Sequence, residues 1–81
     1  MELRFIGIDP ETGTDNCPAV FVEEDTGDLV FQGWTVTDER MLAEVAARSP
    51  IAGHESVVRL PARMKAIIKE AVSDSEGAAV Q

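Results

Sequence analysis

The sequence contains very few of the residues that build disulfides and metal centres. Cys17 is its one cysteine and His54 its one histidine. One cysteine cannot close a disulfide within the chain, and a zinc site needs three or four nitrogen or sulfur ligands. We therefore expect neither an internal disulfide nor a zinc centre. A lone cysteine also fits a reducing compartment, so a cytoplasmic location is expected.

Long apolar runs are missing as well. No stretch approaches the roughly 20 apolar residues that a membrane-spanning helix needs. The first residues do not combine a basic segment with an apolar one, as a signal peptide would. The sequence therefore predicts no membrane partner.

Basic residues are scarce. The chain has 7 Lys and Arg against 15 Asp and Glu, which gives a net charge of −8. Residues 1–35 carry one basic and eight acidic side chains, a net charge of −7, whereas residues 36–81 carry six basic and seven acidic ones, a net charge of −1. Direct nucleic-acid binding needs a basic surface for the phosphates, and this composition argues against it. The acidic half favours a basic protein partner or simple solubility.

Phosphate and metal motifs are not evident. The six glycines are scattered singly, so no glycine-rich phosphate loop is present. The loop 9–18 does hold four side chains with oxygen ligands, namely Asp9, Glu11, Asp15 and Asn16. Pro10, Thr14 and the lack of a distal glutamate break the EF-hand pattern. An ordinary polar loop is the favoured interpretation, a weak divalent-ion site stays open, and no cofactor is predicted.

The segment 18–34, in contrast, has the pattern of a β-hairpin. Residues 19–22 and 29–31 are β-branched and aromatic runs. Gly27 adopts positive φ without strain, which favours a three-residue turn over a two-residue turn at 26–27. The longer turn pairs Phe21 with Phe31 and Val22 with Val30. One face then carries Ala19, Phe21, Leu29 and Phe31, and the other carries Val20, Val22, Val30 and Trp34; a slip of one residue would exchange partners between the faces.

Further strands and two helices follow from the rest of the chain. Strands are expected at 2–8 and 56–60, with Leu3, Phe5 and Gly7 on one side of the first strand. A short amphipathic helix is expected from an N-cap at Thr37 to the stop at 49–50. A second helix begins at Pro61, with apolar residues at helical spacing through residue 72.

The predicted fold class is α+β. We expect a small, mainly antiparallel four-stranded sheet, in the order β-β-β-α-β-α, with two helices packed on one face. Residues 1–72 would form this single domain, and residues 73–81 a flexible carboxyl-terminal tail.

One sheet face should then lie uncovered, because two short helices on one side leave the other side exposed. We expect a homodimer or a partner complex through that face. The predicted interaction residues are Val20, Val22, Val30 and Trp34 as the apolar contact face, with Glu23, Glu24, Asp25 and Asp28 as an acidic rim. The alternative is that loop 9–18 folds over the face.

Two local patterns raise the question of catalysis. Asp25, Thr26 and Gly27 match the short signature of aspartic proteases, in which two carboxylates share a proton. That signature normally follows an apolar strand, whereas acidic residues flank it here, so a solvated turn is favoured. Cys17 and His54 would make a nucleophile and base, but nothing in the sequence positions them together. We predict no catalytic residues and a protein that is not an enzyme.

Four segments have a familiar pattern when taken together. They are residues 3–10 (LRFIGIDP), 30–34 (VFQGW), 54–58 (HESVV) and 60–64 (LPARM). The chain resembles a group of short hypothetical proteins of actinobacteria, especially streptomycetes, whose genes often lie near those for helix-turn-helix regulators. The resemblance spans roughly residues 3–68 and supplies no catalytic residues. It implies a cytoplasmic accessory protein in a regulatory or developmental circuit.

Three functional hypotheses follow. The first is a non-enzymatic protein-interaction module, a homodimer that acts as an accessory factor in a regulatory system. The second is an acidic DNA mimic or antirepressor that binds a basic DNA-binding regulator. The third is a small enzyme or ligand-binding protein whose site forms at a dimer interface.

Overall fold

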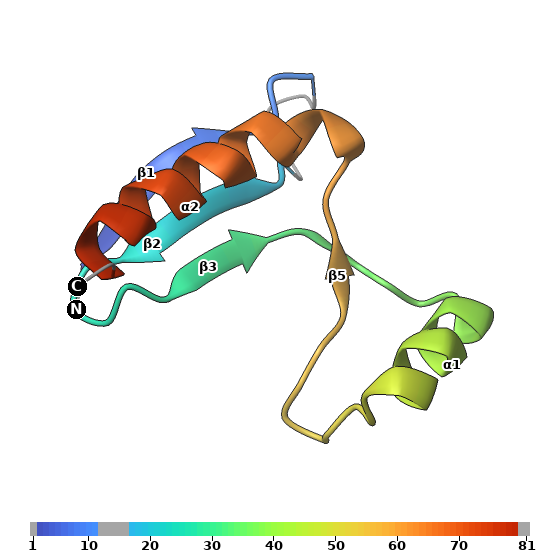
Figure 1. The fold of residues 1–81 in the computed structure, drawn as a ribbon. Helices are drawn as coiled ribbons and strands as arrows, with labels where there is room; N and C mark the ends of the chain where they lie inside the picture. Colours follow the sequence, from blue (N-terminus) through green and yellow to red (C-terminus); the bar gives the residue numbers. More distant parts are fainter. Residues whose placement is uncertain (1, 12–16, 80–81) are drawn as a thin grey trace.

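The computed structural model describes residues 2–11 and 17–79, with the side chains of 74–79 excepted. These residues form an α+β fold with a three-stranded sheet, a two-stranded sheet and two α-helices (Figure 1). The elements are β1 (Leu3–Ile8), β2 (Ala19–Glu23), β3 (Leu29–Gln32), β4 (Trp34–Thr35), α1 (Glu39–Arg48), β5 (Val58–Arg59), the 3₁₀ turn η1 (Ala62–Met64) and α2 (Lys65–Ala79). The predicted fold class is confirmed.

The main sheet has the order β1-β2-β3, with antiparallel pairing throughout. Strand β2 lies in the middle, which is why Ala19, Val20 and Val22 are buried. A bulge in β1 breaks the register between Phe5, which pairs with Phe21, and Gly7, which pairs with Val20. A bulge puts an extra residue on one strand and reverses the inward and outward alternation beyond it.

Helix α2 packs on one face of this sheet, along β1 and β2 (Figure 1). The core consists of Val20, Val22, Met64 and Ala71, with Ile6, Leu60, Ile67 and Ile68 packed against it. The helix approaches the sheet closely at Gly7, where a Cβ atom would lie 2.8 Å from Ile67 Cγ2. A side chain there would force the Ile67 side chain to shift.

The β2–β3 turn differs by one residue from the predicted one. Phe21 pairs with Val30 and Val22 with Leu29, so the loop comprises residues 24–27. Gly27 has a φ of 82°, as its place in the turn requires. Its N–H donates to Glu23 O at 2.8 Å, and the Glu23 N–H donates to Asp28 O at 2.8 Å. The loop therefore holds four residues instead of the predicted three, and each residue of β2 pairs with the β3 residue one position earlier than predicted.

The predicted fourth strand does not join the main sheet. Strand β5 pairs with β4 instead, Trp34 opposite Arg59 and Thr35 opposite Val58, and the Val36 N–H extends this ladder by donating to Val57 O at 2.9 Å. Gly33 separates β3 from β4, because a Cβ there would lie 2.7 Å from Arg59 O. The chain therefore leaves the main sheet at this glycine rather than continuing as one strand to residue 35.

Helix α1 belongs to this second unit, which we call the arm (residues 34–59). Figure 1 shows the arm extending away from the main sheet, with α1 at its far end. The expectation that two helices cover one face is therefore corrected: of the helices in the described residues, α2 alone packs there. The radius of gyration, 14.1 Å, reflects the projecting arm. A compact chain of this length has a radius of about 12 Å.

The helix ends follow local chemistry. Asp38, rather than the predicted Thr37, is the N-cap of α1, and its Oδ1 accepts from Arg40 N at 2.9 Å and Met41 N at 3.4 Å. Helix α1 ends at Arg48, as predicted from the following Ser49 and Pro50. Helix α2 continues to Ala79, past the predicted end at residue 72. Four of the seven residues 73–79 are serine, aspartate or glycine, which have low helix propensity. Each residue added to an existing helix contributes a hydrogen bond, which favours continuation of the helix.

Candidate interaction surface

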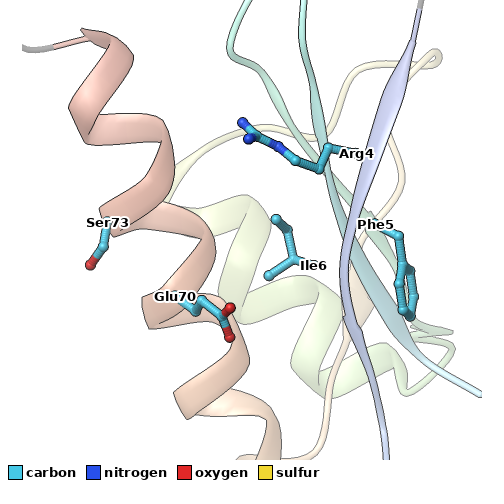
Figure 2. A pocket seen from close by; sticks show the side chains of 5 residues that line it. All are labelled: Arg4, Phe5, Ile6, Glu70 and Ser73. Atoms are coloured by element: carbon cyan, nitrogen blue, oxygen red, sulfur yellow. The ribbon is translucent and has the colours of Figure 1, made fainter.

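The side of the main sheet opposite α2 presents an apolar surface. In antiparallel strands, paired residues project to the same face. The row of Phe5, Phe21 and Val30 is therefore on one face, and Figure 2 shows Phe5 on the other side of β1 from Ile6, which points towards α2. We call this side the open face and define it by Leu3, Phe5, Ile8, Phe21 and Val30.

Most of the open face is exposed to solvent. Phe5 is 57% exposed and Leu3 is 49% exposed, and Ile8 and Val30 are also exposed. Phe21 is half-buried, with its ring centroid 5.6 Å from that of Phe5 in a tilted arrangement. Ala19, on the same face, is buried. Aromatic side chains contribute the largest apolar areas at interfaces, so Phe5 is the main candidate anchor of this surface.

The predicted contact residues divide between several environments. Val20 and Val22 are 0% and 1% exposed, because they face α2, so the prediction that they lie on an exposed face is corrected. Val30 is on the open face. Trp34 is 38% exposed but lies in β4, on the arm. The one-residue difference in the turn, together with the break at Gly33, explains why the predicted grouping separates.

Sequence reasoning missed Leu3, Phe5 and Ile8 as members of this surface. The alternation in β1 did place Leu3 and Phe5 on one side, but it placed Gly7 with them and Ile8 opposite. The bulge between Phe5 and Gly7 moves Ile8 to the side of Phe5. A bulge of this kind leaves little trace in a six-residue apolar strand, because both of its faces are apolar.

The predicted acidic rim forms the β2–β3 turn. Glu24, Asp25 and Asp28 are exposed, and Glu23 is half-buried at the end of β2. Arg4 Nε lies 3.4 Å from Glu24 Oε2, which ties the turn to β1. The Thr26 hydroxyl donates to Glu23 Oε1 at 3.1 Å and accepts from Asp28 N at 3.1 Å. The Asp25–Gly27 triplet is thus part of an exposed turn.

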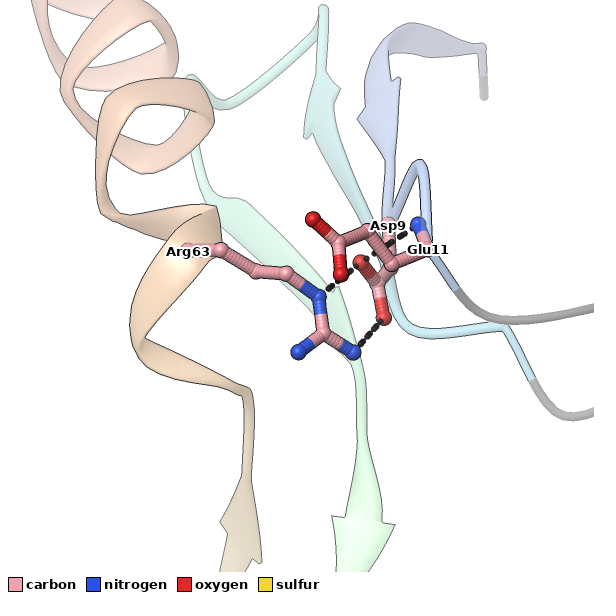
Figure 3. Close-up of polar contacts among 3 residues, drawn as sticks. All are labelled: Asp9, Glu11 and Arg63. Atoms are coloured by element: carbon pink, nitrogen blue, oxygen red, sulfur yellow. Dashed lines mark hydrogen bonds and ion pairs between the residues drawn. The ribbon is translucent and has the colours of Figure 1, made fainter.

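The most buried charged contact joins the end of β1 to η1. The side chain of Asp9 is 0% exposed, and that of Arg63 is 39% exposed. Arg63 donates from Nε to Asp9 Oδ1 at 2.6 Å and from Nη2 to Oδ2 at 2.7 Å, a bidentate pair (Figure 3). Asp9 Oδ1 also accepts from Glu11 N at 3.1 Å. This contact anchors α2 to the end of β1 and the start of loop 9–18.

The electrostatics of this contact favour the charged guanidinium. The pKa of Arg63 is raised from its ordinary value, chiefly by the hydrogen bond to Asp9, with smaller contributions from the charges of Asp9 and Glu11 and against the opposing effect of desolvation. Asp9 and Glu11, two of the four possible divalent-ion ligands in loop 9–18, thus lie near the guanidinium of Arg63. Asp15 and Asn16 lie outside the described residues. In the described part of the chain, no three His, Cys, Asp or Glu side chains gather as a metal site would require.

A hollow of about 500 Å³ lies between β1 and α2 (Figure 2). Its lining residues are Arg4, Phe5, Ile6, Glu70 and Ser73. Among them Glu70 is the one carboxylate, and neither histidine nor cysteine is present. Two carboxylates are therefore not paired among these described lining residues, and Ser73 is the one side chain there with a hydroxyl group.

The remaining candidates for catalysis stay apart in the fold. Cys17 is half-buried just before β2, and His54 is exposed in the connection between α1 and β5. That connection is a tight turn in which Ala52 N donates to Glu55 Oε1 and Glu55 N donates to Ala52 O, each at 3.0 Å. His54 therefore belongs to the arm, and Cys17 belongs to the main sheet.

Helix α1 carries a second apolar surface. The helix is amphipathic, yet none of its described side chains is buried; Met41, Leu42, Val45 and Ala46 are half-buried. Met41 and Val45 line a mainly apolar hollow of about 380 Å³ on the surface of the helix, together with Glu44, Arg48 and Ser49. The described structure thus exposes apolar surface on the open face and on α1. Further large apolar side chains are exposed outside these two surfaces, namely Leu29, Phe31, Trp34, Val58 and Val72.

Comparison with known proteins found no matching family model, no match among curated proteins and no match among solved structures. No helix in the described part of the chain has both the length and the apolar composition that crossing a bilayer requires.

Proposed function

We propose that this protein is a non-enzymatic protein-interaction module that forms a homodimer through the open face. The observation that carries the proposal is an apolar sheet surface centred on Phe5, with Leu3, Ile8 and Val30 exposed around it. Contiguous exposed apolar surface is uncommon on monomeric proteins, and it typically marks a site of association.

The size of the exposed surface supports association. The solvent-accessible area of the chain is 6017 Å². A compact monomer of 8.7 kDa exposes about 4,700 Å² by the usual scaling with mass. The difference, about 1,300 Å², exceeds the roughly 800 Å² that each partner buries in a stable interface of standard size.

The cellular role follows from the same features. An acidic chain with an apolar contact surface fits an accessory protein of the cytoplasm that acts on other proteins rather than on nucleic acid or membranes. The resemblance to actinobacterial proteins encoded near helix-turn-helix regulators favours a regulatory system as its setting. We therefore propose a regulatory accessory protein.

Phe5→Glu tests this function. A carboxylate at the centre of the interface would have to be buried without a partner, so we expect the dissociation constant of the dimer to rise at least about 30-fold, which corresponds to about 2 kcal/mol. Ala66→Glu, at an exposed position of α2, is the matched control and should leave the dimer intact. Equal dissociation constants for both variants, measured by sedimentation equilibrium, would contradict a role for the open face.

The second candidate, an acidic antirepressor that binds a basic regulator, is favoured by the exposed acidic turn. Salt separates the two functions. Copies with a net charge of −8 repel each other, so added salt should leave self-association unchanged or tighten it. Binding through the acidic turn should weaken steeply with salt and be lost in the Glu23→Ala, Glu24→Ala, Asp25→Ala triple variant.

A further inference from the structure

We infer that the second copy covers the open face with its α1 helix, so that two copies exchange their arms reciprocally. This inference rests on the proposed self-association and names the surfaces that meet. The open face of each copy would be covered by α1 of the other copy, so that two-fold symmetry makes the same sheet–helix contact twice.

The fold leaves room for one helix on the open face. Helix α2 covers β1 and β2 on one side of the main sheet and leaves Leu29 and Phe31 of β3 exposed there. No described element lies over Phe5 and Leu3 on the other side. An antiparallel sheet with both faces apolar needs a layer on each side. A helix from the partner completes a helix–sheet–helix arrangement without any change in the main sheet.

Helix α1 has the surface that such a layer needs. Its side chains are at most half-buried in the arm, and Met41 and Val45 line an apolar hollow on its surface. Phe5 is the most exposed aromatic side chain of the open face. We place the ring of Phe5 from one copy in the hollow beside Met41 and Val45 of the other.

Charge favours the arm over a second sheet as the covering layer. Residues 1–35, which contain the open face, have a net charge of −7. Packing two open faces together would bring two acidic turns to one interface, at an electrostatic cost. The arm carries three basic and four acidic side chains, a net charge of −1, so an arm on a sheet avoids most of this repulsion.

The shape of the chain agrees with exchange. The arm extends away from the main sheet (Figure 1). A projecting, amphipathic element that finds its covering surface on a second copy is the usual basis of reciprocal exchange between protomers. The area in excess of a compact monomer, about 1,300 Å², exceeds the roughly 800 Å² that each copy buries in one interface of standard size.

Complementation between two damaged copies tests this arrangement. Phe5→Glu should damage the open face, and Val45→Glu should damage α1, so each variant alone should sediment as a monomer at about 100 µM. A mixture should form a heterodimer, because the intact α1 of the first variant can bind the intact open face of the second. Ala47→Glu, exposed on the same helix and outside the hollow, is the matched control and should dimerise as the wild type does.

The outcomes separate the inference from the proposed function. A dimeric Val45→Glu beside a monomeric Phe5→Glu would overturn the arm exchange and leave self-association through the open face intact. Two monomeric variants that do not complement would also overturn the exchange. A wild-type protein that stays monomeric at about 100 µM would overturn both proposals.

A cross-link provides a readout that does not depend on the folding of the charged variants. In a Cys17→Ser background, one copy carries Phe5→Cys and the other Val45→Cys. Mild oxidation of the mixture should give mainly the mixed disulfide, because disulfide formation requires Cβ atoms about 4 Å apart. Homodimers linked through position 5 as the main product would indicate that two sheets face each other, and they would overturn the exchange.

Discussion

Asp9 forms the buried charged contact that attaches η1, and with it the start of α2, to the end of β1. Its carboxylate is buried, accepts two hydrogen bonds from Arg63 and one from the Glu11 N–H, and follows directly after β1. A buried carboxylate is stable only when its oxygens accept hydrogen bonds or pair with a cation. A guanidinium that donates two parallel hydrogen bonds is among the strongest partners for it. The contact therefore links residues far apart in sequence at the point where β1 ends.

Replacing Asp9 should destabilise the fold. Asp9→Ala removes charge-assisted hydrogen bonds, so we expect a loss of about 2 kcal/mol in the free energy of unfolding and a fall of about 10 °C in Tm. Glu11→Ala is the control, because it keeps the N–H that donates to Asp9 and removes an exposed carboxylate whose charge is the smallest contribution to the raised pKa of Arg63; it should change Tm much less. Thermal unfolding followed by circular dichroism measures both. A Tm for Asp9→Ala equal to that of the control would contradict a structural role for the carboxylate.

The pH dependence of the contact between Asp9 and Arg63 follows from the direction in which the pKa of Arg63 is shifted. The pKa of Arg63 is raised in the folded state, so the stability it contributes is complete below the pKa in the unfolded chain and is lost only as pH rises through the still higher folded value. Arginine is charged throughout the accessible range. The difference in Tm between the wild type and Arg63→Met should therefore be constant from about pH 7 to about pH 10. A difference that shrinks across this range would show that another group controls the contact.

For single residues, the sequence predicted local backbone conformation better than contacts between residues far apart in the chain. It identified Gly27 as the residue of positive φ, because glycine has no Cβ atom to clash in that conformation. It also identified Pro50 as the end of α1, because a proline disfavours the helical conformation of the residue before it. It did not predict the pairing of Asp9 with Arg63, since no local pattern connects residues so far apart in the chain. Contacts of this kind depend on how α2 docks on the sheet.

At the scale of the elements, Gly33 is the residue between the main sheet and the arm. A continuous strand from 29 to 35 would have kept β4 in the main sheet, and the predicted fourth strand would have paired beside it. The chain instead turns away at Gly33, where the backbone of Arg59 approaches too closely for any side chain. The pairing of β4 with β5 therefore requires a glycine at position 33.

Gly33→Ala should weaken the arm selectively. Its Cβ would lie 2.7 Å from a backbone oxygen, which cannot move as a flexible side chain can, so we expect the β4–β5 ladder to open while the main sheet persists. Hydrogen exchange reports this, because the Val36 N–H donates to Val57 O across the ladder and should lose protection. Gly53→Ala, which has open space around its Cβ, is the control. Unchanged protection at Val36 would show that the ladder tolerates the side chain.

The strands and helices themselves were largely predictable, and their pairing was not. Apolar alternation and breaker residues located β1, β2, β3, α1 and the start of α2 within a few residues. The register of the hairpin was wrong by one residue, because residues 19–22 and 29–31 are apolar on both faces and fix no unique alignment. That error grouped Val20 and Val22 with Val30. Their assignment to the exposed surface was wrong for a second reason, since the sequence does not show which face α2 covers. The prediction that one sheet face is uncovered agrees with the exposure of Phe5 and Leu3.

At the scale of the whole molecule, the chain exposes more surface than its mass requires. The main sheet is covered on one face, the arm extends from it, and apolar side chains remain exposed on both units. Apolar surface contributes about 25 cal/mol per Å² when it is removed from water, so association through this surface has a substantial driving force. A small domain that buries little within itself gains much of its stability from a partner.

Sedimentation velocity of the wild-type chain, from about 1 to 100 µM, tests the central claim most directly. The account predicts a concentration-dependent species of twice the 8.7 kDa mass of the chain, and a Tm that rises with protein concentration because the dimer is the more stable form. A single 8.7 kDa species across the whole range, with a constant Tm, would contradict it.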